Sequence, residues 1–319
     1  EATLRDADIV LKVRRPESAE IAAMKSGALL VCMLSPHDDR PSLDAIARAG
    51  IAAFSMELMP RITRAQSMDV LSSQANLAGY RAVIDAAAAF GQALPMMMTA
   101  AGTVPAAKVF IMGVGVAGLQ AIATARRMGA IVTATDVRPA TKEQVASLGA
   151  KFVAVEDEEF KQAETTAGYA KPMSAEYQRK QAELVANHLK TQDIVITTAL
   201  IPGRPAPRLI SEAMVRTMKP GAVIVDLAAE RGGNCELTVP GMTSEVHDVK
   251  ILGPKNLAGE IATNASSLYA RNLYAFLETM FDKKAKTLNI DWNDEIVKGT
   301  LITRDGQIVH PAMAASKAA

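Results

Sequence analysis

The segment GVGVAG, residues 113–118, constrains the fold of this chain more than any other stretch. The apolar run KVFIM precedes it, and the helical pattern VAGLQAIATARRMG continues from it. A glycine-x-glycine-x-x-glycine spacing is weak evidence alone, but between a strand and a helix it is typical of a dinucleotide-binding turn. In such a turn Gly113 allows the tight bend, Gly115 lets a pyrophosphate approach the backbone, and Gly118 lets helix and strand pack closely. The motif therefore predicts a Rossmann-like unit whose helix N-terminus faces phosphates.

The residue at the end of the next expected strand indicates which dinucleotide is bound. Asp136 ends the run IVTATD, and a carboxylate there accepts hydrogen bonds from ribose hydroxyls and repels a 2′-phosphate. Arg138 complicates this interpretation, because a guanidinium can neutralise such a phosphate. Since Asp136 holds the strand-end position itself, the pattern favours NAD(H).

Strands and helices alternate on both sides of this unit. One run has strands at 8–13, 28–34 and 52–58, and a second run extends from residue 108 to about 228. Near-continuous apolar strands separated by amphipathic helices imply parallel sheets covered on both faces. A long helical pattern at 67–93 connects the two runs. We predict an α/β protein with two Rossmann-like, doubly wound parallel-sheet domains joined by a long helix.

The first domain is expected to be discontinuous. The segment VKILGP and the helical run 264–282 resemble the alternation of the first run. We therefore assign residues 1–72 and 241–319 to the first domain and residues 73–240 to the NAD(H)-binding Rossmann domain. The chain starts without methionine and soon enters a strand, so we expect the first domain to be N-terminally truncated.

Composition argues against nucleic acid and against a metal site. Lys and Arg number 35, Asp and Glu number 34, and aromatic residues make up 4%, which leaves neither excess basic charge nor many stacking platforms. Cys32 and Cys235 fit no metal-ligand spacing and indicate a reducing compartment. The cysteine spacing therefore predicts no metal site. No segment reads as a signal peptide or spanning helix, so we expect a soluble fragment.

The stretch PRITRAQSMD, residues 60–69, is an unusual junction between an expected strand and an expected helix. It holds Arg61, Arg64, Gln66 and Asp69 and contains no glycine. Arg and Asp at such a junction can serve simply as surface charge and helix cap. A rigid stretch rich in hydrogen-bonding groups also suits a site that positions a ligand.

The chain offers few groups for proton transfer. A dehydrogenase that oxidises an alcohol or amine needs a group that takes the proton, usually His or Lys. Only one histidine follows an expected strand, and solvated roles are expected for the other three; the four are His37, His188, His247 and His310. His37 is therefore the single candidate acid or base.

Long segments of the chain resemble one family. They are RITRAQSMD, NLAGYRAVIDAA, MTAAGTVPAAKV, GVGVAGLQAIATARRMGA, ATKEQVASLGA, AGYAKPM, TTALIPGRPAPRLI and MKPGAVIVDLAAERGGNCE, and the likeness covers nearly the whole chain. Together they are similar to the NAD(H)-binding component, domain I of the alpha subunit, of proton-translocating nicotinamide nucleotide transhydrogenase, in the alanine dehydrogenase/transhydrogenase family.

The resemblance implies an activity and a set of partners. The reaction is direct, Re/Si-specific hydride transfer between NADH on this chain and NADP+ on a separate domain, coupled to inward proton movement through a membrane domain. A homodimer at the cytoplasmic face of the bacterial inner membrane is also implied. Hydride transfer between two nicotinamides leaves no substrate proton to remove, which agrees with the shortage of acid and base groups. Roles at the nicotinamide end are implied for Arg61, Gln66, Asp69 and Ser72, contacts to the rest of NAD for Val116 and Asp136, and a place in a mobile lid for Tyr169.

Two alternative functions stay open. Alanine dehydrogenases are similar over the GRPAP and MKPGAV segments, but KVRRP and CMLSP put Arg14 and Ser35 where that family has a lysine and a histidine. Lys12 and His37 lie nearby in sequence, so a displaced amino-acid site stays open. A non-catalytic NAD-binding module is the third hypothesis.

Overall fold

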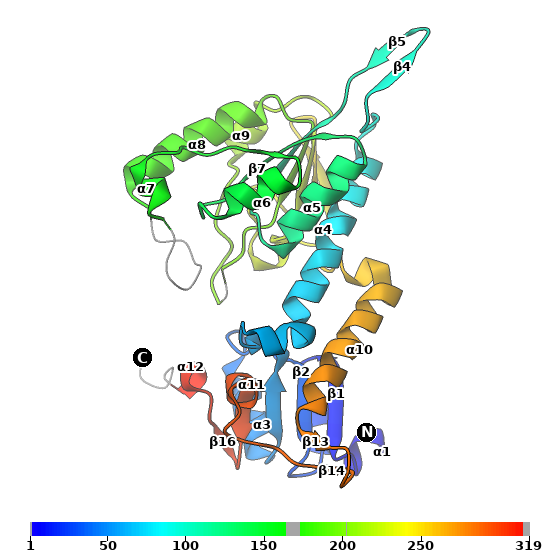
Figure 1. The fold of residues 1–319 in the computed structure, drawn as a ribbon, viewed down its shortest axis with the longest axis vertical. Coiled ribbons are helices and arrows are strands. Elements are labelled where there is room, and N and C mark those ends of the chain that lie inside the picture. The colour runs from blue at the N-terminus through cyan, green and yellow to red at the C-terminus, as the bar shows by residue number, and fades with distance from the viewer. Residues whose placement is uncertain (1, 164–172, 202, 315–319) are drawn as a thin grey trace. The chain divides into compact units, whose positions relative to one another are not determined.

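The computed structural model describes residues 2–163, 173–201 and 203–314, and the chain divides into two compact units. The first unit comprises Glu1–Gln74 and Thr263–Ala319, and the second comprises Ala75–Ala262. Each has a central sheet flanked by helices (Figure 1). The predicted α/β, Rossmann-like class is confirmed.

The second unit contains a seven-stranded sheet in the order β11-β12-β10-β9-β6-β7-β8. All neighbouring strands pair in parallel except β11 with β12. The strand order reverses between β6 and β9, and open parallel sheets bind ligands at the carboxyl ends of their strands at such a switch point. The bounds are β6 Lys108–Met112, β7 Ile131–Thr135, β8 Lys151–Phe152, β9 Ile194–Thr197, β10 Val223–Asp226, β11 Thr243–Val246 and β12 Val249–Leu252.

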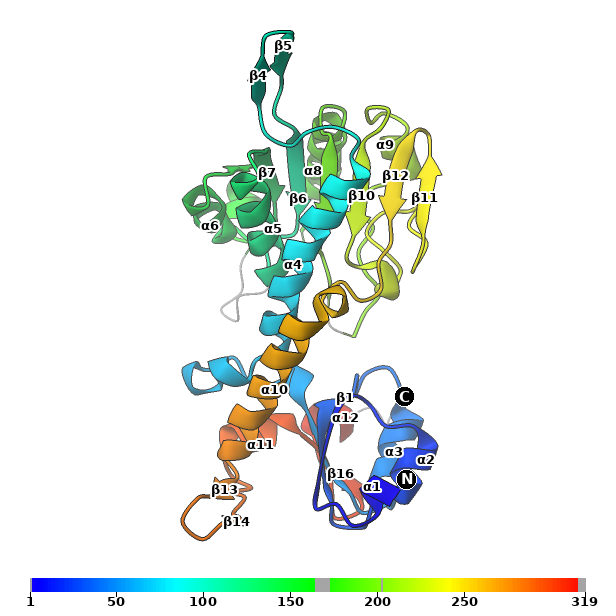
Figure 2. The same cartoon turned by 90° about the vertical axis from the view of Figure 1, so that its right-hand side faces the viewer.

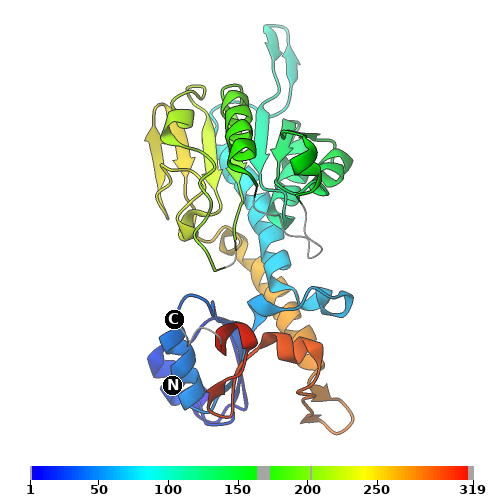
Figure 3. The same ribbon diagram turned by 90° about the vertical axis from the view of Figure 1, so that its left-hand side faces the viewer.

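Helices cover both faces of this sheet, as the opposite views in Figures 2 and 3 show. Successive side chains of a strand point to opposite faces, so Val109 and Ile111 pack with α4, α5 and α6, while Phe110 and Met112 pack with α8 and α9. This explains why the strands read as continuous apolar runs. The helices are α4 Val70–Ala89, α5 Val116–Arg127, α6 Thr141–Ser147, α7 Glu158–Lys161, α8 Ala175–Leu189 and α9 Glu212–Val215, with the 3-10 turn η3 Ala229–Arg231.

The first unit contains a five-stranded sheet in the order β1-β2-β3-β15-β16. Strands β1, β2 and β3 are parallel, and β15 and β16 add antiparallel pairs. Helices α2 and α3 pack on one face, and α10 and α11 pack on the other. The bounds are β1 Ile9–Arg14, β2 Leu29–Met33, β3 Ala52–Ser55, β15 Leu301–Arg304, β16 Gln307–Ile308, α1 Ala2–Arg5, α2 Ser18–Ala23, α3 Arg40–Arg48, α10 Ala262–Glu278, α11 Glu295–Thr300 and α12 Pro311–Ala314.

The chain returns to the first unit later than the sequence indicated. Strand β12 pairs with β10 and carries β11 on its outer edge, so both strands complete the sheet of the second unit. The boundary expected at residue 241 is therefore corrected to residue 263. The apolar alternation of VKILGP identifies a buried strand, but the sheet that it joins depends on hydrogen bonds to distant strands.

The long connecting helix is shorter than expected. Helix α4 has 20 residues and begins at Val70, because Asp69 is extended and ends the preceding 3-10 helix η2, Thr63–Met68. Another 3-10 turn, η1 Met56–Leu58, follows β3 where the strand was expected to continue. None of the described helices is long and apolar enough to cross a lipid bilayer.

Candidate functional site

The glycine motif forms the turn between β6 and α5 at the switch point of the sheet. Gly113 has φ +102°, and a Cβ added there would lie 2.5 Å from Thr198 Oγ1. A Cβ added to Gly118 would lie 1.9 Å from the carbonyl oxygen of Gly113. At Gly115 an added Cβ would meet no heavy atom within 4 Å. The two outer glycines thus serve the protein's own packing, whereas the middle one borders open space of the kind that a pyrophosphate fills.

Helix α5 presents its N-terminus to the same opening. Its N-cap residue, Gly115, is extended and provides no side-chain cap to the first turn. The first N–H groups of a helix lack intrahelical partners and carry a partial positive charge, which favours an anion. Val116, at the first helical position, is partly exposed beside this opening. These features fit the phosphates of a dinucleotide.

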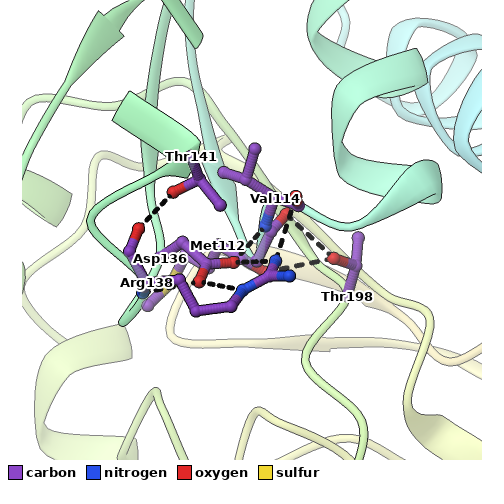
Figure 4. Close-up of polar contacts among 7 residues, drawn as sticks. Met112, Val114, Asp136, Arg138, Thr141 and Thr198 are labelled. Atoms are coloured by element: carbon purple, nitrogen blue, oxygen red, sulfur yellow. Dashed lines mark hydrogen bonds and ion pairs between the residues drawn. The ribbon is translucent and has the colours of Figure 1, made fainter. Parts of the chain in front are cut away.

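Asp136 and Arg138 form one charged unit beside the turn, shown in Figure 4. Asp136 Oδ2 accepts hydrogen bonds from Val114 N at 2.7 Å and from Arg138 Nη2 at 3.0 Å. Oδ1 accepts from the backbone N and the Nε of Arg138, each at 2.9 Å. The carboxylate thus ties the glycine turn to the end of β7, and Arg138 supports its negative charge. In the sequence, Asp136 favours NAD(H), whereas Arg138 could neutralise the 2′-phosphate of NADP(H); in the structure the two side chains form one ion pair.

The loop that follows β9 closes the other side of the glycine turn. Thr198 donates from Oγ1 to the carbonyl of Gly113 at 3.0 Å and from its backbone N to the carbonyl of Met112 at 2.8 Å. These bonds satisfy the turn from across the switch point (Figure 4). Thr198 was not singled out in the sequence, because a threonine after a strand carries no distinctive signal.

A fully buried carboxylate organises the loop after β10. Asp226 is 0% exposed and is the last residue of its strand, β10, whereas Asp136 follows the last residue of β7. An acidic residue where an apolar strand ends is the signal that could have identified Asp226 in the sequence. Its donors, all within 2.7–3.0 Å, are Thr197 Oγ1, Ala228 N, Cys235 N and Thr238 Oγ1.

Asn234 joins this loop to the loop after β9. Its Oδ1 accepts from Ala199 N at 3.0 Å, and its Nδ2 donates to the carbonyls of Ala199 and Pro207 at 2.9 and 2.8 Å. The amide is fully buried, so these bonds replace the ones that water would make. The two loops at the carboxyl edge of the sheet are therefore held in a fixed arrangement.

In the first unit, the stretch around Gln66 is a short 3-10 helix, η2. A 3-10 helix repeats every three residues. Ala65 and Met68 lie on its buried side, 1% and 4% exposed, and pack into the core under α10. Arg64 and Gln66 lie on exposed positions. Packing of Ala65 and Met68 is the physical reason that this segment holds one shape without glycine.

Asp69 and Ser72 are brought together at the start of α4. Ser72 donates its backbone N to Asp69 Oδ1 at 2.9 Å and its hydroxyl to Oδ2 at 2.5 Å. Arg64 pairs with Asp294 at 2.8 Å, and Asp294 in turn caps α11. Asp69 thus has a capping role in the described contacts, and its expected role at the nicotinamide end stays a prediction.

The predicted site residues fall into two groups. Arg61, Gln66, Asp69 and Ser72 belong to the first unit, and Gly113, Gly115, Val116, Gly118 and Asp136 belong to the second. Tyr169 lies outside the described residues.

The strand ends of the first unit hold a carboxylate network. Glu57 accepts the backbone N–H groups of Leu34 and Ser35 at 3.0 and 2.7 Å and the hydroxyl of Ser55 at 2.5 Å. Ser35 therefore lies at the end of β2 with its N–H committed to Glu57, and His37 is exposed in the turn beyond it. Within the described residues, no group of three or more His, Cys, Asp and Glu side chains is placed to hold a metal ion.

Two family models match the chain. The alanine dehydrogenase/PNT N-terminal domain matches residues 1–78, and the alanine dehydrogenase/PNT C-terminal domain matches residues 82–311. The chain belongs to the alanine dehydrogenase/PNT family. The resemblance to the transhydrogenase members of this family is confirmed by individual relatives.

Two bacterial relatives illustrate this, each described as the first section of NAD(P) transhydrogenase subunit alpha. The protein from Rhodospirillum rubrum is 59% identical over 315 residues, which cover 97% of this chain and 82% of that protein. The protein from Rickettsia prowazekii is 49% identical over 312 residues, covering 96% and 80%.

Solved structures of family members have the same fold. The transhydrogenase from Sinorhizobium meliloti superposes with a TM-score of 0.87 at 60% identity and covers 97% of this chain and 83% of that one. An L-alanine dehydrogenase superposes with a TM-score of 0.74 at 23% identity, covering 98% and 81%, which shows a shared fold alone. Family and fold together support binding of a nicotinamide nucleotide.

Proposed function

We propose that this chain is the NAD(H)-binding component of a proton-translocating NAD(P) transhydrogenase. The observation that carries the proposal is the open space at Gly115 beside an uncapped helix N-terminus, in a turn whose Val114 N–H is bonded to the Asp136 carboxylate. The chain that contains this turn is 59% identical to a section of a transhydrogenase alpha subunit.

The charge beside the turn favours NAD(H) over NADP(H). A carboxylate at the end of β7 accepts hydrogen bonds from ribose hydroxyls and repels a 2′-phosphate. Arg138 is engaged with Asp136 through both Nε and Nη2, so its charge is directed at the carboxylate. Contact with the ribose therefore requires Asp136 to share an oxygen to which Val114 or Arg138 already donates.

The proposed reaction is direct hydride transfer between NADH on this chain and NADP+ on a separate domain. Such a transfer needs the two reacting carbons at about 3–3.5 Å with water excluded, and it needs no acid or base from the protein. We assign Arg61, Gln66, Asp69 and Ser72 to holding the nicotinamide end. Gln66 donates or accepts at the carboxamide and faces the partner nucleotide, while Arg61 and Asp69 brace the site.

The proposed partners are a separate NADP(H)-binding domain and a proton-conducting membrane domain, with this chain at the cytoplasmic face of the bacterial inner membrane.

Arrangement as a homodimer is supported by the hairpin of β4 Met97–Thr99 and β5 Gly102–Val104, which projects from its own unit in Figure 1. Met98 of β4 and Met96, which precedes the strand, are 80% and 62% exposed, and exposed apolar side chains in a group indicate a contact surface. Sedimentation velocity should give a dimer that weakens when both methionines are replaced by serine.

One set of assays tests the proposal. The purified chain is incubated with NADH and an oxidised NADP analogue, with and without an NADP(H)-binding domain from a transhydrogenase, and separately with NAD+ and L-alanine. Hydride transfer that requires the partner domain is the expected result. Turnover of L-alanine would instead indicate an alanine dehydrogenase, and NADH binding without transfer in any mixture would indicate a binding module.

A further inference from the structure

A buried amide lies directly behind the 3-10 helix that carries Gln66. Asn272 of α10 is 7% exposed, and its Nδ2 donates to the carbonyl of Ser67 at 2.8 Å. Its Oδ1 accepts the hydroxyl of Ser73 at 2.8 Å. One side chain therefore joins η2 to the first turn of α4, from a position 205 residues away in the sequence.

The chemistry of the two partners fixes the orientation of this amide. A carbonyl can only accept, so Nδ2 must face Ser67, and Ser73 then donates to Oδ1. Gln74 extends the same network, since its Nε2 donates to Ser73 Oγ at 3.2 Å and to the carbonyl of Ala265 at 3.3 Å. Asparagine supplies one donor and one acceptor here, which neither aspartate nor leucine can do.

Asn272 interrupts an otherwise apolar face of α10. Tyr269, Leu273 and Phe276 lie on the same buried side and pack into the core beneath η2. Burying an amide among such residues is costly unless both of its ends are hydrogen-bonded. The hydrogen-bonded amide at this position fixes the rotation of η2 about its own axis, which apolar packing alone does not do.

We propose that Asn272 is a positioning residue that holds Gln66 in the orientation used for hydride transfer. Ala65 and Met68 fix the depth of η2 in the core. The bond from Asn272 to the Ser67 carbonyl fixes its rotation, and this sets the direction of the Gln66 side chain. The inference rests on the proposed function, in which Gln66 lies at the nicotinamide end.

The test compares variants that remove one side of the network at a time. Asn272→Leu and Asn272→Asp both remove the donor to Ser67, whereas Ser73→Ala leaves it intact. Thr303→Val is the matched control, because Thr303 is fully buried in the same unit and its side-chain hydrogen bonds join Ala53 N and the carbonyl of Ile51, in and directly before β3. Three quantities are measured for each: Tm, the Kd of NADH, and the single-turnover rate of hydride transfer with the partner domain.

Asn272→Leu should slow hydride transfer by about 10- to 100-fold, the usual effect of a small misplacement, while the Kd of NADH changes less than about threefold. Thr303→Val should lower Tm and leave the rate near that of the wild type, and Ser73→Ala, which keeps the bond from Asn272 to Ser67, should slow transfer less than Asn272→Leu does. Rates that follow Tm across all four variants would overturn the proposal. If Asn272→Asp does not fold, the neutral Asn272→Leu variant carries the comparison.

A double variant distinguishes positioning through Gln66 from a general effect on the fold. If Asn272 acts through Gln66, then Gln66→Asn combined with Asn272→Leu should transfer hydride no more slowly than the slower single variant. Multiplicative losses would overturn the inference. Absence of transfer in the wild type with its partner would contradict the proposed function itself, whereas wild-type rates in Asn272→Leu would contradict only the role of Asn272.

Discussion

The guanidinium of Arg138 donates hydrogen bonds to both oxygens of the Asp136 carboxylate, with Nε 2.9 Å from Oδ1 and Nη2 3.0 Å from Oδ2. This fork keeps a negative charge beside the glycine turn and directs the positive charge of Arg138 toward it. The balance between the two residues should therefore decide which dinucleotide binds.

Replacement of Asp136 by asparagine should lower NADH affinity about tenfold, which corresponds to about 1.4 kcal/mol, and should raise NADPH affinity. The neutral side chain is a weaker acceptor for the ribose and releases Arg138 toward a 2′-phosphate. Fluorescence titration with each nucleotide measures both effects, and Asp248→Asn, at an exposed turn position, is the control. Unchanged NADPH affinity would show that Arg138 does not face the ribose.

Two alanine substitutions in the glycine motif should have different effects. Gly118→Ala places a methyl group 1.9 Å from the Gly113 carbonyl, so we expect a lower Tm together with loss of binding. Gly115→Ala meets no protein atom within 4 Å and has an ordinary φ of −81°, so Tm should change little while NADH affinity falls at least about tenfold. Calorimetry gives both quantities. Normal NADH binding by Gly115→Ala would contradict the phosphate site.

The variant Gln66→Asn shortens one exposed side chain of η2 by a methylene group. We expect hydride transfer to the partner domain to slow about 10- to 100-fold, with NADH binding weakened less than about threefold, because the change affects alignment more than contact area. Stopped-flow single turnovers measure the rate of hydride transfer, and equilibrium titration measures the affinity for NADH. Gln307→Asn, exposed in β16, serves as the control. Equal losses of rate and affinity would argue against the assignment.

Stability of the second unit should depend on the protonation of His188. Burial, aided by the positive charges of Lys151 and Lys108, lowers the pKa of His188 below its ordinary value of about 6.5. The folded state thus keeps the ring neutral, hydrogen-bonded to Thr133 at 2.8 Å, while the unfolded chain binds a proton near pH 6.5. The contribution of His188 to stability is complete above about pH 6.5 and is lost as pH falls through the lowered pKa.

The corresponding measurement is Tm between about pH 8 and pH 5 for the wild type and for His188→Gln. The variant should lose less Tm on acidification. Burial also lowers the pKa of His310, so His310→Gln is needed to separate its contribution in the first unit. Parallel curves for the wild type and His188→Gln would contradict the prediction.

Much of the proposed nucleotide site was accessible from local patterns. The strand, the glycine turn and the helix are consecutive in sequence, and Asp136 follows the very next strand, so a short segment encodes them all. The distinction between Gly115 and the other two glycines of the motif needed the three-dimensional structure, because only the surroundings show which glycine borders open space. The fork between Asp136 and Arg138 was likewise hidden, since sequence gives two charges but not their contact.

Neighbouring residues were enough to predict the α/β class, the glycine turn between strand and helix, and the family, because periodicity, turn chemistry and long motifs are all local properties of the chain. The folded structure was needed to show that β12 belongs to the second unit, that Asp226 and Asn234 fix the loops at the sheet edge, and that Asn272 lies behind Ser67. These are contacts between segments distant along the chain. Their partners are selected by packing and by the need to satisfy buried polar groups, and no local pattern records either.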